Sequence, residues 1–420
     1  MSRFSDQTAP PCLSRWVIFV LSLACGVGVA NIYFPQAISS LIADSLHVST
    51  DSAALVVTAA QLGYAAGIFL LVPLGDRVPH RRLIVTLLII TSLGLIAACS
   101  APSLPVLIGA SAAIGVTTVV PQIIIPMAAG LVPADRRGAV TGTLLSGLIG
   151  GILLARTFSG TLGEWLGWRA PYMVAAVVVL ALAVLLAAVV PVTTPASRQR
   201  YPSLLAEPLR LLRAEPELRR SCFYQATVFA GFSAAWTCIT LLITGPKYHM
   251  GAQVVGLIAL VSAGTMFCTP IAGRMVDRKG PDVVNLVCLL GAIASAVLLA
   301  PGALGGVVGL VALLVGMLLL DVAMQSGQVA NQARIFALRP EARSRLNTAY
   351  MTCAFLGGSA GSWLGVRAYD HLGWNGVTGL VALAAGLALV RHLLHRASPA
   401  VAPAARQAGS DEPEIAPAVR

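Results

Sequence analysis

The chain has 420 residues, of which 57% are hydrophobic and only 11% are charged, and its mean hydropathy is +0.83. A soluble protein of this length needs far more charge to cover its surface, so a soluble enzyme is excluded. The formal net charge of +11 resides in short segments between apolar runs, where topology and anionic lipid headgroups explain it better than nucleic acid does.

Apolar runs long enough to cross a bilayer recur along the chain, and lipid requires that such runs be helical. The strand-like alternation that a membrane β-barrel needs is absent. The first run is too long for the core of a cleavable signal peptide, so we expect it to be retained as a span. The sequence predicts an all-α membrane protein with twelve transmembrane helices, at residues 14–38, 51–73, 83–100, 104–130, 139–162, 169–190, 222–244, 253–274, 282–300, 305–332, 346–367 and 373–394.

Basic residues are distributed unevenly between the segments that join these spans. If both termini lie on one side, only Arg169, Lys247 and Arg367 fall on the other side, and Arg156 falls within a span. The remaining 24 of the 28 basic residues then share the side of the termini. The positive-inside rule therefore predicts a multi-pass protein of the bacterial inner (cytoplasmic) membrane with both termini in the cytoplasm.

The longest hydrophilic segment, residues 192–220, separates two groups of six spans. We expect it to be a cytoplasmic central loop between an N-terminal six-helix bundle at 1–191 and a C-terminal six-helix bundle at 221–396. Residues 397–420 are rich in alanine and proline, which predicts a disordered cytoplasmic tail.

The two groups of spans share short motifs at nearly constant spacing. The pair Asp76–Arg77 recurs as Asp277–Arg278 after the second span of each group. Further matches at one constant offset pair Pro133, Arg136, Gly150 and Gly151 with Pro340, Arg343, Gly357 and Gly358. A duplicated six-helix unit with a binding site at the interface of the repeats is a transporter architecture. The repeat therefore predicts two pseudo-symmetric bundles around a central cavity.

From residue 14 to about residue 395 the chain resembles the Major Facilitator Superfamily. The most specific mark is the loop signature Gly-x-Leu-x-Asp-Arg-x-Gly-Arg-Arg, which the segment from Gly273 to Gly280 fits well. The copy around Asp76 keeps the core of the signature and departs from it at both glycines. Within the family, the pattern of Asn31, Tyr33 and Gln36 in the first span looks most like bacterial efflux-type members, which export drugs or sugars.

The resemblance implies two bundles that rock around a cavity lined by spans 1, 4, 7 and 10. It also implies a cytoplasmic gate that aspartates and arginines of the loops hold closed. The residues that match this role are Asp76, Arg77, Arg81, Arg136, Asp277, Arg278 and Arg343.

Asp321 is the one acid that the sequence places deep within a span. A carboxyl group at that depth is costly and normally faces a cavity or a partner. Because burial disfavours the ionised form, such a group can exchange a proton, and Asp321 is the proton-coupling candidate. The alternative is a structural ion pair, or a buried acid that never titrates.

Arg156 is the corresponding cation within the fifth span. An arginine is not readily neutralised, so it has to pair with a carboxylate or bind an anionic group of a substrate. A third possibility is that its side chain extends to lipid headgroups. The sequence leaves these three alternatives open.

Several polar and aromatic residues lie on spans that are expected to line the cavity. Each amide could equally form a hydrogen bond between helices, and Trp236 could be part of the core. As a set, the residues are substrate-contact candidates, namely Asn31, Tyr33, Gln36, Gln122, Arg156, Tyr224, Trp236, Gln325 and Asn331.

Small-residue patterns predict positions where helix backbones approach closely. We expect Gly361 to bring the eleventh span against the second. The full set of packing glycines is Gly63, Gly67, Gly147, Gly151, Gly357, Gly361 and Gly365.

Taken together, these patterns predict a secondary active transporter that moves a small solute by alternating access, with proton-coupled efflux by an antiporter as the expected mode. Two alternatives stay open: proton-coupled uptake of a small carboxylated metabolite, and a non-transporting membrane sensor. The sequence contains no HExxH motif, phosphate loop or CxxC pair, so we expect no enzyme activity, no cofactor and no metal site. The expected partners are a small-molecule substrate, the proton and the lipid bilayer, and the protein is expected to be monomeric.

Overall fold

A computed structural model describes residues 13–133, 136–191, 200–262, 264–339 and 342–397. The predicted tail, apart from residue 397, and residues 192–199 of the predicted central loop lie outside these ranges. The described residues contain helices and no strand, which confirms the all-α class.

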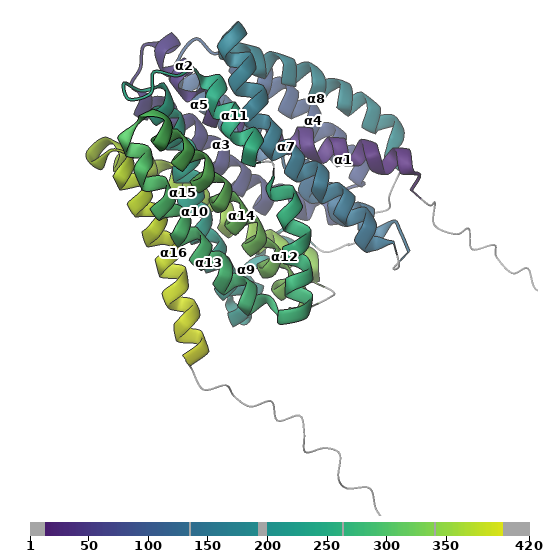
Figure 1. Cartoon of the computed structure of the whole chain (residues 1–420). Helices are drawn as coiled ribbons and strands as arrows, with labels where there is room; N and C mark the ends of the chain where they lie inside the picture. Colours follow the sequence, from purple (N-terminus) through teal and green to yellow (C-terminus); the bar gives the residue numbers. More distant parts are fainter. Residues whose placement is uncertain (1–12, 134–135, 192–199, 263, 340–341, 398–420) are drawn as a thin grey trace, which may run out of the picture.

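The helices follow one another with short connections (Figure 1). In chain order they are α1 (Arg15–Ala30), α2 (Phe34–Leu46), α3 (Thr50–Leu71), η1 (Val72–Asp76), α4 (His80–Cys99), α5 (Leu104–Thr117), α6 (Val120–Gly130), α7 (Arg137–Leu166), α8 (Arg169–Val189), α9 (Tyr201–Ala214), α10 (Pro216–Thr244), α11 (Ala252–Ser262), α12 (Thr265–Lys279), α13 (Pro281–Leu299), η2 (Ala300–Leu304), α14 (Gly306–Leu338), α15 (Arg343–Leu372) and α16 (Trp374–Ala397).

Ten segments of the described chain are long and apolar enough to cross a membrane, and they match ten of the twelve predicted spans. The predicted eighth span is divided between α11 and α12. The predicted eleventh span is the 30-residue helix α15, whose length suffices to cross a bilayer but which is not among those ten. Ten of the twelve predicted spans are therefore confirmed.

Two further spans are broken in the middle, and their breaks lie side by side. The first span changes from α1 to α2 around Asn31, and the fourth changes from α5 to α6 at Thr118. Asn31 donates a hydrogen bond to the Thr118 hydroxyl (3.3 Å), and that hydroxyl donates to the carbonyl of Gly28 (2.5 Å). Side chains thus satisfy backbone groups that the breaks release, as lipid requires.

Helix packing follows the same plan in both halves of the chain. In the N-terminal half α1 packs on α7, α3 on α5 and α4 on α8, and in the C-terminal half α10 packs on α15 and α13 on both α14 and α16. The halves meet where α3 packs on α15, α7 on α11, and α2 on α10. Figure 1 shows α2 and α9 near opposite ends of the molecule. We call these ends the α2 face and the α9 face.

The predicted packing glycines do contact neighbouring helices, and each contact lies within one half of the chain. A methyl group on Gly63 or Gly67 would overlap α5, and one on Gly147 or Gly151 would overlap α1. The expectation that Gly361 faces the second span is wrong, because Gly361 lies against α10. The contact between α15 and α3 instead includes hydrogen bonds that Ser359 and Ser362 of α15 donate to α3, and an edge contact between the rings of Tyr64 and Phe355. The remaining two glycines of this helix, Gly357 and Gly365, also lie against α10.

Candidate functional site

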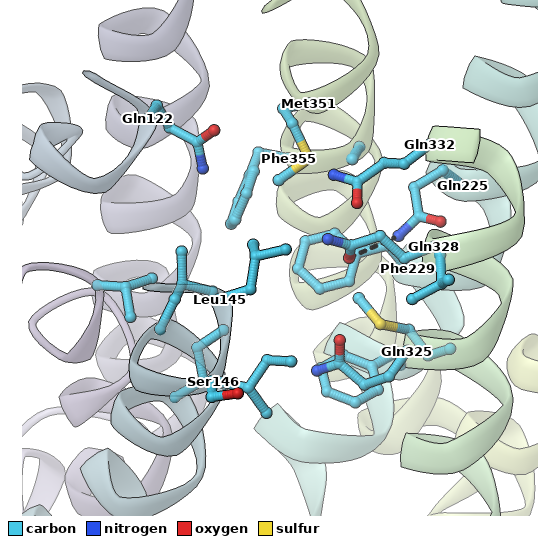
Figure 2. Close-up of a pocket in the computed structure, with 18 of the residues that line it drawn as sticks. Gln122, Leu145, Ser146, Gln225, Phe229, Gln325, Gln328, Gln332, Met351 and Phe355 are labelled. Atoms are coloured by element: carbon cyan, nitrogen blue, oxygen red, sulfur yellow. Dashed lines mark hydrogen bonds between the residues drawn. The ribbon is translucent and has the colours of Figure 1, made fainter. Parts of the chain in front are cut away.

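A cavity of about 350 Å³ lies between the two halves, and it is the site with the best claim to hold a solute. Figure 2 shows Leu145 and Ser146 on one wall and Gln328 and Gln332 on another. None of the described side chains that line it carries a formal charge. Its surface is chiefly apolar and aromatic, with five glutamines as the main polar groups, namely Gln122, Gln225, Gln325, Gln328 and Gln332.

Amide side chains connect the two halves across this cavity. Asn347 on α15 donates to the side-chain oxygen of Gln122 on α6 (3.2 Å), and Gln332 on α14 donates to Asn347 (3.4 Å). Gln225 on α10 donates to Gln328 (3.4 Å), the bond drawn in Figure 2. Such hydrogen bonds are weak enough to exchange partners, which suits a cavity that has to bind and release a polar solute.

Sequence reasoning named Gln122 and Gln325 but missed the other glutamines. A usable signal was present, because Gln325, Gln328 and Gln332 follow the spacing of one helix face. That face of α14 carries amides along the length of the cavity.

Two aromatic rings of the cavity lining also contact Arg156, a residue that is not itself part of the lining. Tyr33 and Phe232 line the cavity, and the Arg156 guanidinium lies 4.9 Å and 5.7 Å from the centres of their rings. Its closest ring is that of Trp236, at 4.0 Å. The Nε group of Arg156 donates to the side-chain oxygen of Gln36 (2.8 Å).

Arg156 is completely buried (0% exposed), so the possibility that its side chain extends to lipid headgroups is wrong. Asp321 on α14 is 1% exposed and acts electrostatically on Arg156. The two groups form no direct ion pair, because neither the terminal nitrogens of Arg156 nor the oxygens of Asp321 have a hydrogen-bond partner. Trp236 and Ser262 complete the surroundings of Asp321.

The remaining cavity candidates occupy other positions. Tyr33, Gln122 and Gln325 line the cavity, whereas Gln36 and Trp236 enclose Arg156. Asn31 supports the break between α1 and α2. Tyr224 and Asn331 lie at a small separate space between α10, α13 and α14. Asn331 also accepts a hydrogen bond from Arg334 (3.3 Å).

The halves are joined tightly on the α2 face. Thr157 donates to the carbonyl of Gly256 (2.7 Å), and Glu164 accepts a hydrogen bond from the amide of Ala252 (2.8 Å). Thr240 donates to the carbonyl of Gln36 (2.5 Å). The cavity lining extends towards the α9 face, as far as Gly142 near the start of α7. The structure is therefore closed at the α2 face.

The predicted gate residues all lie on the α9 face. Asp76 is half-buried at the end of η1, while Asp277 at the end of α12 is exposed, and no direct ion pair from either residue to the opposite half occurs in the described residues. An ion pair that the sequence analysis missed joins Arg345 to Glu207 on α9 (2.5 Å). Arg81 is partly buried, and the other predicted gate arginines are exposed, namely Arg77, Arg136, Arg278 and Arg343.

Comparison with known proteins gives a consistent result. An uncharacterized transporter of Escherichia coli O157:H7, YgaY, is 37% identical over 365 residues, which cover 87% of this chain and 92% of that protein. A protein named "Probable transporter SCO4007", from Streptomyces coelicolor, is 36% identical over 370 residues, covering 87% and 84%. A chloramphenicol resistance protein of Streptomyces lividans is 26% identical over 274 residues, covering 64% and 68%.

Among solved structures, a mutant of the nucleoside transporter NupG matches with a TM-score of 0.69 at 14% identity, covering 91% of this chain and 98% of that one. This likeness shows the fold alone. The family model of the Major Facilitator Superfamily matches residues 17–362, which confirms the resemblance carried by the loop signature. The chain therefore belongs to the Major Facilitator Superfamily of membrane transporters.

Proposed function

We propose that this protein is a proton-coupled secondary transporter that exports a small solute by alternating access. The bundles at 1–191 and 221–396 are the moving parts, and the cavity between them holds the solute. One observation carries the coupling proposal: Asp321 is fully buried and acts electrostatically on Arg156, which contacts two rings of the cavity lining. A buried carboxyl group that changes its accessibility can carry a proton across the membrane.

The direction of export rests on two supports. The Asn31, Tyr33 and Gln36 pattern resembles that of efflux-type members, and one relative is named a chloramphenicol resistance protein. The distribution of basic residues places the α9 face in the cytoplasm. On this orientation the described conformation is closed to the outside, with its cavity extending towards the cytoplasm.

A second candidate function is proton-coupled uptake of a small carboxylated metabolite. The observation that favours it is Arg156, a buried cation with two terminal nitrogens that lack a hydrogen-bond partner. The sensor alternative has no such observation in its favour.

The test is a flux measurement with purified protein in proteoliposomes, with and without an imposed pH gradient. Chloramphenicol is the first export probe and simple monocarboxylates are the uptake probes. We expect a gradient-dependent flux that Asp321→Asn abolishes. A wild-type flux that is equal with and without the pH gradient would contradict proton coupling.

A further inference from the structure

Three arginines in the described chain are at least nine-tenths buried, and one of them differs from the others. Arg220 and Arg334 both contact Asp282, with N–O distances of 2.9 Å and 2.5 Å. Arg156 has no carboxylate at contact distance, and its Nη1 and Nη2 atoms donate to nothing. A buried cation without such partners is costly. Within the described chain, Arg220 and Arg334 thus have a carboxylate partner, whereas Arg156 has none.

Three buried donor atoms at Arg156 lack a hydrogen-bond partner, namely Gln36 Nε2, Arg156 Nη1 and Arg156 Nη2. Native proteins rarely leave buried polar groups unpaired. Asp321 lies near this group, and its carboxyl interacts with Trp236 and Ser262. We call the surroundings of these two opposite charges, formed by Gln36, Trp236 and Ser262, the compartment.

The unpaired edge of Arg156 is the one that binds a carboxylate through two parallel hydrogen bonds. Its orientation is fixed, because Nε is bonded to Gln36 and the guanidinium lies over the ring of Trp236. Tyr33 and Phe232 contact the guanidinium and also line the cavity. These two rings therefore contact both Arg156 and the space that a solute would occupy.

We infer that Arg156 is the binding subsite for a single carboxylate of the transported solute, whose apolar part occupies the aromatic cavity beyond Tyr33 and Phe232. The inference rests on the second candidate of the proposed function, the uptake of a small carboxylated metabolite, because it names the residue that would hold the carboxylate.

Charge balance then assigns a second role to Asp321. The compartment holds one positive and one negative charge, and a bound monoanion would leave it with an excess negative charge in a medium of low dielectric constant. Protonation of Asp321 restores neutrality. The ionisable groups that act on Asp321 in the described chain are Arg156 and Tyr33, while α10 and α11 present the uncharged Trp236 and Ser262. The carboxylate and the proton are therefore bound together, which is the arrangement of the uptake candidate.

The experiment measures binding of benzoate to the purified full chain by calorimetry, in two buffers with different ionisation enthalpies. We expect benzoate to bind at least about tenfold more tightly than the neutral benzamide, as a charge-assisted bidentate contact implies. Binding should take up about one proton per benzoate, which is the difference between an ionised and a protonated carboxyl. Arg156→Gln should lower the affinity by about tenfold or more, whereas Asp321→Asn should keep the affinity and lose the proton uptake.

Arg367→Gln is the matched control, because Arg367 also lies over a tryptophan, Trp363, at 4.5 Å, but outside the compartment. It should bind benzoate like the wild type. Equal affinity for benzoate and benzamide in the wild type would overturn the inference without any variant. A purely structural pair would also overturn the inference. In that case the wild type does not bind benzoate, Arg156→Gln and Asp321→Asn each lower the melting temperature, and the double variant restores it. Gradient-driven flux in proteoliposomes without benzoate binding would reject this substrate class and leave the transport function in place.

Discussion

Gly361 on α15 lies against Ala230 on α10 so closely that a methyl group on the glycine would overlap the carbonyl oxygen of Ala230. Gly357 and Gly365 meet α10 in the same way, one turn to either side. Small residues of this kind let membrane helices approach until their backbones touch. The packing of α15 on α10 therefore depends on the absence of side chains along this line.

Gly361→Leu should destabilise the protein, because the inserted side chain has no space and the two helices have to move apart. Overpacking of a buried contact typically costs about 1–3 kcal/mol, measured here as a lower melting temperature in detergent. Gly379→Leu on α16 is the control, since nothing lies within 4 Å of the position of its added side chain. A melting temperature for Gly361→Leu equal to that of the control would show that this contact does not hold the helices together.

The orientation of the chain can be tested by reporter fusions at Arg200 and after Arg396. Both positions should report the cytoplasm, because the basic residues concentrate on the side of α9 and of the termini. A fusion at Lys247, on the α2 face, should report the periplasm. Periplasmic reporter activity at either of the first two positions would reverse the assignment of the two faces.

The gate hypothesis concerns Asp76 and Asp277, which the repeat places at equivalent points of the α9 face. Asp76→Asn and Asp277→Asn should each lower the transport rate several-fold without loss of expression, because contacts of the state closed at the α9 face weaken while the bundles stay packed. Asp44→Asn, an exposed acid at the end of α2, is the control. Rates unchanged in both single variants and in the double variant would remove these residues from the gate.

Closure at the α2 face depends on Glu164, which accepts a hydrogen bond from the first amide of α11 in the opposite half. A carboxylate at a helix N-terminus also interacts favourably with the helix dipole. Glu164→Ala should raise the hydrogen-exchange rate of the first turn of α11 by about fivefold, which corresponds to a capping contribution of ~1 kcal/mol. Glu164→Gln keeps an acceptor and should give a smaller rise. Exchange at the wild-type rate in both variants would mean that other contacts close this face.

The sequence predicted the order and class of the helices well, because long apolar runs have one stable structure in lipid. The division of the predicted eighth span between α11 and α12, in contrast, does not follow from the length of an apolar run. The direction in which a side chain points was harder still. For Arg156 the sequence leaves a contact with lipid headgroups open, yet the side chain lies against Trp236 of the other half, because the rotation of α7 is set by its contacts with α1 and α11. The burial of Asp321, in contrast, follows from its depth in the span alone.

The final prediction concerns coupling. Asp321 is fully buried and has no ion-pair partner among the described residues, so neutralising it removes the charge on which proton exchange depends. Asp321→Asn should abolish accumulation driven by a pH gradient in proteoliposomes, while exchange of labelled for unlabelled solute continues, because the amide mimics the protonated acid. Arg156→Gln should lose both activities, since it removes the group that holds the solute.

If the two residues form only a structural pair, each single variant should instead be unstable, because a lone buried charge costs more than none. The double variant Arg156→Gln with Asp321→Asn should then recover the lost stability. Accumulation by Asp321→Asn at the wild-type level under the same gradient would show that this residue is not needed for coupling.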